Sequence, residues 1–470
     1  MREFSWGIAL LVGVGAIFVA LEVPLGPIVI LGIVIAFILT YRYTYGVLYL
    51  AIALSPFLGL MISIPTGELA IGERAFGGSV DIGVAEALFL FVLAAWAVKV
   101  LVLWVRRKDK NWRPTLPLIR SYAALVAAHF LSLLSPYAPD PILVAKASIR
   151  PVLFCYLVYV AIPVNLLRNR RRLVTVFSIL AVVGTIGALN GLVSLFFVDA
   201  SSQFIRRAHP LPIFGVSALG DNHNLLAELM VTTVLMTLAA ALLARKERVR
   251  RLLFGSAALQ FAIGLLTFSR TGWIVFGLQA AFLAVVGYRA TIRRHLGAVL
   301  AVILLLIPLT GVMLRIGLSN VAMSSNSTRV ALLEIAMQVW ESSPWIGGGA
   351  GTFVDRVGSA QVFLIEYGAP LDSHGMLPKL AAETGLVGFL AFVWVMGTFV
   401  WLAATRLKTI TDPIVRRAVL LVLASAGGAV AYQMLNTNYW TGKMWLPVGL
   451  AVASLFAFSR TGRHKPTTNV

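Results

Sequence analysis

The chain has 470 residues, of which 59% are hydrophobic and 12% are charged, and its mean hydropathy is +0.89. Soluble domains contain roughly 45 to 50% apolar residues, so this composition excludes a water-soluble protein built around ordinary cores. The net charge of +20 does not indicate nucleic-acid binding, because the basic residues stand in short clusters between apolar runs, as topology signals do in membrane proteins.

Apolar runs long enough to cross ~30 Å of hydrocarbon recur from one end of the chain to the other. They predict an all-α, polytopic integral membrane protein with about fourteen transmembrane helices, in which residues 1–470 form a single transmembrane domain. The first is expected to be an uncleaved helix, because no small-residue cleavage site follows it. The predicted spans lie near residues 6–21, 25–40, 46–64, 83–105, 116–135, 148–166, 174–197, 223–244, 252–268, 273–288, 298–316, 379–404, 418–436 and 444–458.

The basic clusters predict the orientation of these spans. When the amino terminus is placed in the cytoplasm and the spans alternate, nearly every cluster falls on the cytoplasmic side, where positive residues are retained. Both termini are therefore expected to be cytoplasmic. The exception is Arg206-Arg207, in an outer segment over about residues 198–222. The inner clusters are Arg106–Lys108, Arg168–Arg172, Arg245–Arg251, Arg293–Arg294, Arg416–Arg417 and Arg460–Lys465.

Residues 317–378 form the longest outer connection, which is too long for a simple turn. Ser327 and Thr328 are suited to cap a helix, and this helix should end near Ser343-Pro344. Its apolar residues recur at i, i+3 and i+4, so one face should be apolar. Two interpretations remain open: a lid that covers an outward-facing cavity, or an ordinary loop helix. The apolar residues are Leu332, Ile335, Ala336, Val339 and Trp340.

Arginines on the outer face are candidates for ligand binding, because membrane insertion selects against positive charge there. A guanidinium group offers a fork of donors that matches phosphate oxygens, so an anion such as a diphosphate is the expected ligand. Alternatively, single arginines pair with Glu68, Glu73, Asp355 or lipid head groups. The outer arginines are Arg74, Arg206, Arg207, Arg270, Arg329 and Arg356, with Arg150 and Arg315 at span ends.

Two short polar segments stand at outer span boundaries. His374 follows Asp372-Ser373, and a neutral imidazole there can accept a hydroxyl proton or make a structural hydrogen bond. His223 lies within Asp221–Asn224, where capping of a helix is the commoner role of Asp and Asn.

Metal and phosphate-loop patterns are absent from the sequence. It contains no HExxH motif, no paired cysteines and no acidic cluster suited to Mg²⁺, so we expect a reaction that needs neither metal nor cofactor. The glycines Gly347–Gly349 with Gly351 either form a turn or offer amides to an anion. They do not match a Walker pattern.

Four outer-face segments together resemble the O-antigen ligase and polymerase superfamily of bacterial envelope glycosyltransferases. They are Gly220–Ala227, Thr267–Gly272, Ser327–Gly349 and Ser373–Gly388. The resemblance implies a GT-C-like enzyme of the bacterial inner membrane with its active site on the periplasmic side. Such enzymes transfer a glycan from an undecaprenyl-diphosphate donor to an acceptor hydroxyl on a glycolipid or lipid-linked glycan. The amino-terminal half matches the family only in hydropathy.

The same resemblance implies roles for individual residues. His374 corresponds to the family histidine that deprotonates or orients the acceptor hydroxyl, and Arg270 and Arg329 to arginines that bind the donor diphosphate. The sequence departs from the commonest family pattern at Gly375, where Asn often follows the histidine. Arg206, Arg207 and Arg150 are added as diphosphate-binding candidates because of their charge and position, and Asn224 and Glu383 as supporting residues.

Three functions remain open at this point. A polymerase that extends a lipid-linked polysaccharide is favoured over a ligase that transfers a finished glycan to lipid A-core, and both would use the same residues. The third is a lipid-linked glycan transporter, which would be expected to show repeated halves and ionisable residues deep inside its spans. That function stays open because five ionisable residues lie within or at the ends of predicted spans: Glu86, Lys99, Arg120, Arg150 and Glu228.

Overall fold

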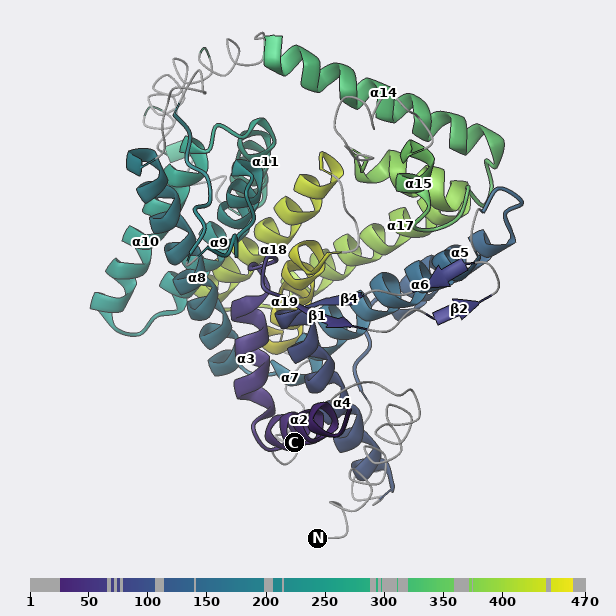
Figure 1. Cartoon of the computed structure of the whole chain (residues 1–470). Coiled ribbons are helices and arrows are strands. Elements are labelled where there is room, and N and C mark those ends of the chain that lie inside the picture. The colour runs from purple at the N-terminus through teal and green to yellow at the C-terminus, as the bar shows by residue number, and fades with distance from the viewer. Residues whose placement is uncertain are drawn as a thin grey trace. The chain divides into compact units, whose positions relative to one another are not determined.

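The computed structural model describes residues 26–65, 69–71, 74–76, 79–105, 114–138, 141–197, 206–213, 215–287, 293–294, 297, 311, 320–358, 372–373, 375–436 and 441–459. The chain divides into two compact units (Figure 1). Unit 1 comprises residues 1–115, 211–221 and 465–470, and unit 2 comprises residues 116–210 and 222–464. The described chain is mostly helical, which confirms that part of the prediction.

The described residues of unit 1 form three apolar helices. They are α2 (Gly26–Arg42), α3 (Thr44–Leu54) and α4 (Val84–Val105). α2 and α3 meet at a bend of 107°. Inside this unit, Lys99 of α4 donates to Thr44 Oγ1 at 2.9 Å and lies over the ring of Tyr41, so its charge has local partners.

Four short strands between α3 and α4 depart from the predicted all-α class. β1 (Met61–Pro65) pairs antiparallel with β4 (Ser79–Gly83), and β2 (Leu69–Ile71) pairs antiparallel with β3 (Arg74–Phe76). The predicted helical span over 46–64 is therefore wrong beyond Leu54. Pro56 follows the end of α3 and cannot continue a helix, and the β-branched residues of Met61–Ile64 favour a strand.

Unit 2 is helical in all its described elements. Its elements are α5 (Ile119–Leu131), the 3-10 helix η1 (Ser132–Leu134), α6 (Pro141–Ala147), the π-helices η2 (Ser148–Leu153) and η3 (Tyr156–Ala161), α7 (Ile162–Leu166), α8 (Arg170–Phe197), α9 (His223–Leu243), α10 (Glu247–Leu266), α11 (Arg270–Phe282), the π-helix η5 (Leu283–Gly287), α14 (Asn320–Ser342), α15 (Phe353–Gly358), α17 (Met376–Leu407), α18 (Pro413–Met434) and α19 (Gly442–Phe458).

Among the described residues, seven helices are long and apolar enough to cross a membrane, or eight if the bent pair α2 and α3 forms one span. This is consistent with a polytopic membrane protein, whereas the predicted count of fourteen is not confirmed. The predicted spans 6–21 and 298–316 lie wholly or almost wholly outside the described residues. The seven are α4, α8, α9, α10, α11 with η5, α17 and α18.

α9 lies at the centre of unit 2, where it packs against α8, α10, α11 and α18. α8 approaches it closely through three glycines: a Cβ on Gly184, Gly187 or Gly191 would lie 2.5 to 2.7 Å from side-chain atoms of α9. Small residues at such spacing let two membrane helices pack backbone to backbone. The three glycines therefore fix how closely α8 and α9 approach.

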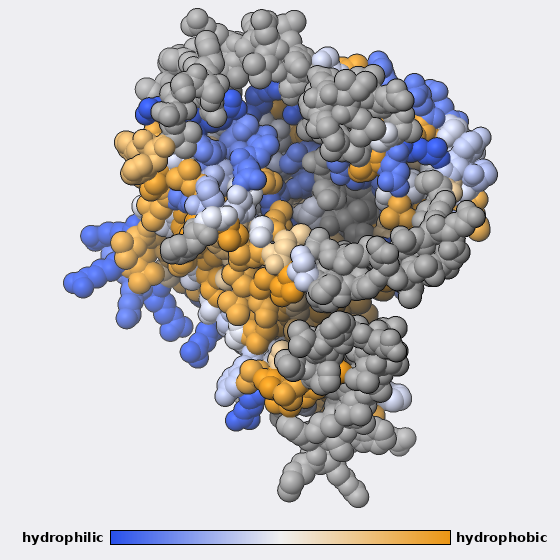
Figure 2. Space-filling view, viewed as in Figure 1, coloured by the Kyte–Doolittle hydropathy of each residue, from blue (hydrophilic) through white to orange (hydrophobic). Residues whose placement is uncertain are grey.

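A hydrophobic surface separates two hydrophilic regions of unit 2. Figure 2 shows the basic side chains that project at the left, where α9 passes into α10, and a second hydrophilic region toward α11, with hydrophobic residues between them. The first region is Arg245–Arg251, which is exposed throughout. α9 spans the distance between the two regions with 21 residues, or about 30 Å, which matches the hydrocarbon thickness of a bilayer.

Candidate functional site

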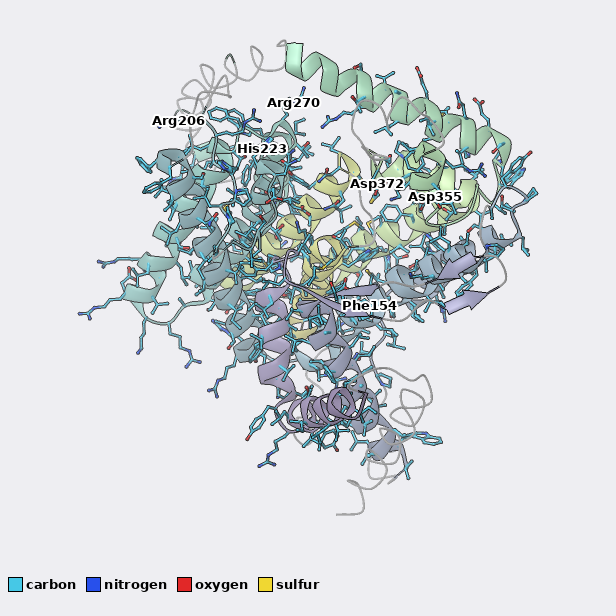
Figure 3. All side chains as sticks on the ribbon, viewed as in Figure 1. Phe154, Arg206, His223, Arg270, Asp355 and Asp372 are labelled. Carbon is cyan, nitrogen blue, oxygen red and sulfur yellow. The ribbon has the colours of Figure 1, made fainter. Side chains whose placement is uncertain are left out.

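Four helices of unit 2 bring their ends together near the amino-terminal end of α9. Ala208 N donates to Leu266 O at the end of α10 (2.8 Å), and His209 N donates to Ser194 Oγ near the end of α8 (3.1 Å). Figure 3 shows Arg206, His223 and Arg270 at this end of the helices. Three of the predicted site segments, which are distant in sequence, therefore lie at one end of the bundle.

Side-chain caps begin the two helices that carry His223 and Arg270. Asn222 Oδ1 accepts from Asn224 N at 2.9 Å, which confirms the capping role suggested for this segment. Ser269 Oγ accepts from Gly272 N at 3.3 Å at the start of α11. The residue before this cap, Phe268, has φ +51°, a left-handed conformation that costs an L-residue roughly 1–2 kcal/mol. This unfavourable turn leaves Arg270 as the first residue of α11.

Arg270 and Arg329 bring two like charges close together from different helices. Burial, followed by the positive charge of Arg270, lowers the pKa of Arg329, although an arginine remains protonated at any physiological pH. The Nε atom of Arg329 is buried and has no hydrogen-bond partner among the described residues. A buried guanidinium donor with a like charge as its neighbour is an arrangement that an anionic ligand would stabilise.

The apolar face of α14 fixes the position of Arg329. Leu332 and Ala336 of α14 are buried in a core cluster with Phe353 and Val357 of α15 and Ala382 of α17. This confirms the apolar face of the predicted helix. The helix ends at Ser342, next to the predicted Ser343-Pro344, but it begins at Asn320 rather than at Ser327-Thr328. That this helix covers a cavity remains a prediction.

The other predicted arginines differ in their surroundings. Arg207 Nη1 lies 3.2 Å from Nε2 of His223, and burial lowers the pKa of Arg207. Arg206 Nη1 donates to Leu195 O at 3.2 Å. Arg207 and His223 therefore lie against each other beside the start of α9, whereas Arg206 is anchored to the end of α8. Arg150 belongs to η2, and its side chain lies outside what the structure describes.

The predicted catalytic residue His374 lies outside the described residues, but both of its neighbours are described. Lys379, in the first turn of α17, forms an ion pair with Asp372, with Nζ 2.7 and 2.8 Å from the two carboxylate oxygens. Ser373 Oγ donates to Gly375 O at 3.0 Å, and Gly375 has φ +155°. The chain on either side of His374 is therefore tied to α17.

The glycine-rich segment after α14 docks into a break in α17. Gly385 has φ +63° and interrupts the helix. Gly348 N donates to Ala382 O (2.8 Å) and Gly349 N donates to Glu383 O (3.0 Å). These amides bind backbone carbonyls, which supports a structural turn for Gly347–Gly349 rather than an anion-binding loop.

Glu383 lies in the same break and is 1% exposed. Its Oε1 accepts from Phe353 N at 3.3 Å, at the start of α15. This contact holds the start of α15 against α17, and a supporting role of Glu383 in the site stays a prediction.

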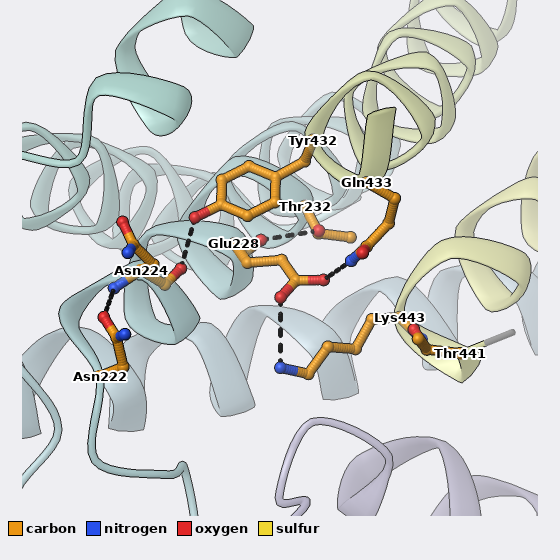
Figure 4. A network of polar contacts seen from close by, with 8 residues as sticks. All are labelled: Asn222, Asn224, Glu228, Thr232, Tyr432, Gln433, Thr441 and Lys443. Atoms are coloured by element: carbon orange, nitrogen blue, oxygen red, sulfur yellow. Dashed lines mark hydrogen bonds and ion pairs between the residues drawn. The ribbon is translucent and has the colours of Figure 1, made fainter. Parts of the chain in front are cut away.

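A buried polar network at the start of α9 was not predicted from the sequence (Figure 4). Glu228, one turn after Asn224, accepts from Gln433 Nε2 through Oε1, and its Oε2 lies 3.3 Å from Lys443 Nζ. Thr441 caps α19 by accepting from Lys443 N at 3.1 Å. The network ties the first turns of α9 to the end of α18 and the start of α19.

In the part of the chain that the structure describes, no group of three or more His, Cys, Asp or Glu side chains is placed to hold a metal ion. The charged groups described near the start of α9 include Arg206, Arg207 and Arg270 and the ion pair of Glu228 with Lys443.

Comparison with known protein families supports the resemblance seen in the motifs. Residues 255–393 match the family model described as O-Antigen ligase. The matched region runs from α10 to α17 and carries Arg270, Arg329 and the residues on either side of His374. The match supports membership of the O-antigen ligase and polymerase superfamily, as the motifs predicted. No curated protein matches the chain.

Proposed function

We propose that this protein is a membrane glycosyltransferase that moves a glycan from an undecaprenyl-diphosphate donor to an acceptor hydroxyl. The observation that carries the proposal is the pair Arg270 and Arg329, in which the buried Nε of Arg329 has no partner within the described part of the chain and lies near a second guanidinium group. The family match over residues 255–393 supports a transferase of this class.

In the proposed reaction the acceptor oxygen attacks the anomeric carbon of the donor glycan. The bond between that carbon and the diphosphate oxygen breaks, and the diphosphate leaves with the electron pair. Arg270 and Arg329 stabilise the charge that grows on the leaving diphosphate, because fixed donors in a region of low dielectric act most strongly on developing charge. A single displacement inverts the configuration at this carbon, and the reaction needs no metal.

His374 accepts the proton of the acceptor hydroxyl in this proposal. Support comes from its neighbours: the ion pair of Asp372 with Lys379 and the Ser373 hydrogen bond constrain the chain beside it. Arg207 with His223 and, at the end of α8, Arg206 add positive charge at the same end of the bundle. Arg150 is retained as a further diphosphate-binding candidate.

The proposed orientation puts both termini in the cytoplasm and the active site on the periplasmic face of the bacterial inner membrane. The exposed basic segment Arg245–Arg251 is at the opposite end of α9 from Arg270. Because basic clusters are retained in the cytoplasm, this separation supports a periplasmic position for Arg270 and Arg329. In this proposal the loop over residues 317–378 is periplasmic, and its amphipathic helix covers the active-site cavity.

The preferred reaction is polymerisation of a lipid-linked polysaccharide, and transfer to lipid A-core by a ligase is the alternative. The test is to incubate purified wild-type protein and His374→Ala with an undecaprenyl-diphosphate oligosaccharide, with and without lipid A-core, and to separate the glycolipids on a gel. A histidine-dependent ladder from the donor alone identifies the polymerase. A product formed only with lipid A-core identifies the ligase, and unimpaired product from His374→Ala overturns the proposed base.

A further inference from the structure

Three hydrogen bonds connect α18 to the first turn of α11 through the start of α9. The Tyr432 hydroxyl donates to Asn224 O at 2.6 Å. The Ser269 hydroxyl donates to Asn224 Oδ1 at 2.7 Å and accepts from Gly272 N at 3.3 Å. Tyr432 is 0% exposed and Ser269 is 1% exposed, so water does not compete for these bonds.

This connection acts on a turn that is unfavourable by itself. Phe268 holds a left-handed conformation immediately before Ser269, and such a residue keeps that conformation only where the surrounding structure enforces it. Asn224 receives one bond on its carbonyl and another on its side chain, so it joins α18 to the Ser269 cap. Arg270 follows that cap directly.

We infer that Tyr432 and Ser269 are positioning residues that fix the first turn of α11, and with it Arg270, against the start of α9. The inference rests on the proposed function, because the arginine that these hydroxyl groups position is the one proposed to bind the donor diphosphate. Tyr432 acts through Asn224 and Ser269, and neither hydroxyl group takes part in bond formation or cleavage. Glu228, bound to the neighbouring Gln433, holds the next turn of α9 to α18 in the same way.

Removal of the Tyr432 hydroxyl tests this inference. Tyr432→Phe should lower kcat/KM for the lipid-linked donor roughly tenfold, because a small displacement of a binding group weakens transition-state stabilisation strongly. The KM for the acceptor should stay unchanged. Ser269→Ala should have the same effect, and Ser269→Thr, which keeps a hydroxyl group for the cap, should restore most of the activity.

Tyr122→Phe is the matched control. Tyr122 is also a buried tyrosine of unit 2, and its hydroxyl also donates to a backbone carbonyl, that of Val152, at 2.8 Å. The same change should leave the donor kcat/KM at the wild-type value. If Tyr122→Phe and Tyr432→Phe lowered the donor kcat/KM equally, the cause would be general destabilisation, and the inference would be overturned.

A double-mutant cycle links the effect to Arg270. If Tyr432 acts by positioning this arginine, Tyr432→Phe should cost little further activity in an Arg270→Lys background. A full tenfold loss in that background would show that Tyr432 acts independently of Arg270 and would overturn the inference.

A measurement without substrate separates this inference from the proposed function. Hydrogen exchange of the peptide over residues 267–273 should be faster in Tyr432→Phe than in wild type and unchanged in Tyr122→Phe. Wild-type protein that is inactive on the donor would count against the proposed function, whereas unchanged exchange in Tyr432→Phe would overturn the positioning role alone.

Discussion

Gly385 lies so close to Trp345 that a Cβ built on the glycine would be 2.3 Å from the Trp345 carbonyl carbon. Leu386 N donates to Pro344 O at 2.8 Å and Val387 N to Trp345 O at 3.2 Å. The segment that leaves α14 therefore supplies acceptors to amides that the break in α17 would otherwise leave unpaired.

Gly385→Ala should destabilise the protein, because it adds a Cβ where there is no space and where φ is +63°. Gly397→Ala is the matched control on the same helix, since a Cβ on Gly397 meets nothing within 4 Å. We expect a Tm lower by several degrees for Gly385→Ala and a Tm at or slightly above wild type for Gly397→Ala. Equal Tm values in detergent would contradict the tight contact.

Replacement of either paired arginine should weaken anion binding. Arg329→Ala should raise the inhibition constant of inorganic diphosphate by roughly tenfold or more, because hydrogen bonds to charged groups contribute about 1.5–3 kcal/mol. Arg270→Ala should behave likewise and abolish transfer while membrane insertion stays normal. Arg251→Ala is the control, since the Arg251 side chain is 79% exposed and pairs with Glu247. An unchanged inhibition constant in Arg329→Ala would remove this arginine from the proposed site.

The ion pair beside His374 should be needed for activity more than for folding. Asp372→Asn removes the partner of Lys379 and loosens the chain before α17, so we expect turnover to fall by roughly a factor of ten. Lys379 is 8% exposed, so Asp372→Asn also leaves a poorly solvated charge and should lower Tm modestly. The measurement is turnover together with thermal unfolding. Glu247→Gln, which breaks exposed ion pairs with Arg250 and Arg251, should change neither.

Separation of the Glu228 and Lys443 charges should be strongly destabilising. Glu228→Gln leaves Lys443, whose side chain is 12% exposed, without its counter-charge, which costs up to about 3–5 kcal/mol in a buried pair. The double variant Glu228→Gln with Lys443→Met removes both charges and should recover most of the loss. Unfolding of wild type, Glu228→Gln, Lys443→Met and the double variant in detergent tests this, and additive losses in the double variant would contradict a direct pairing.

Local signals in the sequence predicted much of the helical structure. Asn222 before α9 and the apolar spacing from Leu332 onward depend on neighbours within one or two turns, and the structure confirms both. The end of α14 near Pro344 follows from the same local rules.

Contacts between distant segments could not be predicted in this way. Nothing near Glu228 in the sequence identifies Lys443, on α19, as its partner. The sequence also does not distinguish Tyr432 from other aromatic residues of membrane helices. The early start of α14 at Asn320 was missed because Ser327 and Thr328 are good caps but are also tolerated inside a helix. The strands between 61 and 83 were missed because apolar runs of this length suit helix and strand alike.

The packing of the apolar face of α14 determines the direction in which the Arg329 side chain points. Leu332 and Ala336 lie one and two turns after Arg329 and are held by α15 and α17. Each residue of an α-helix turns the chain by about 100°, so a one-residue insertion between Arg329 and Leu332 would swing the guanidinium group to another side of the helix without disturbing the buried face. The length of this short stretch must therefore stay constant in evolution for Arg329 to keep its position near Arg270.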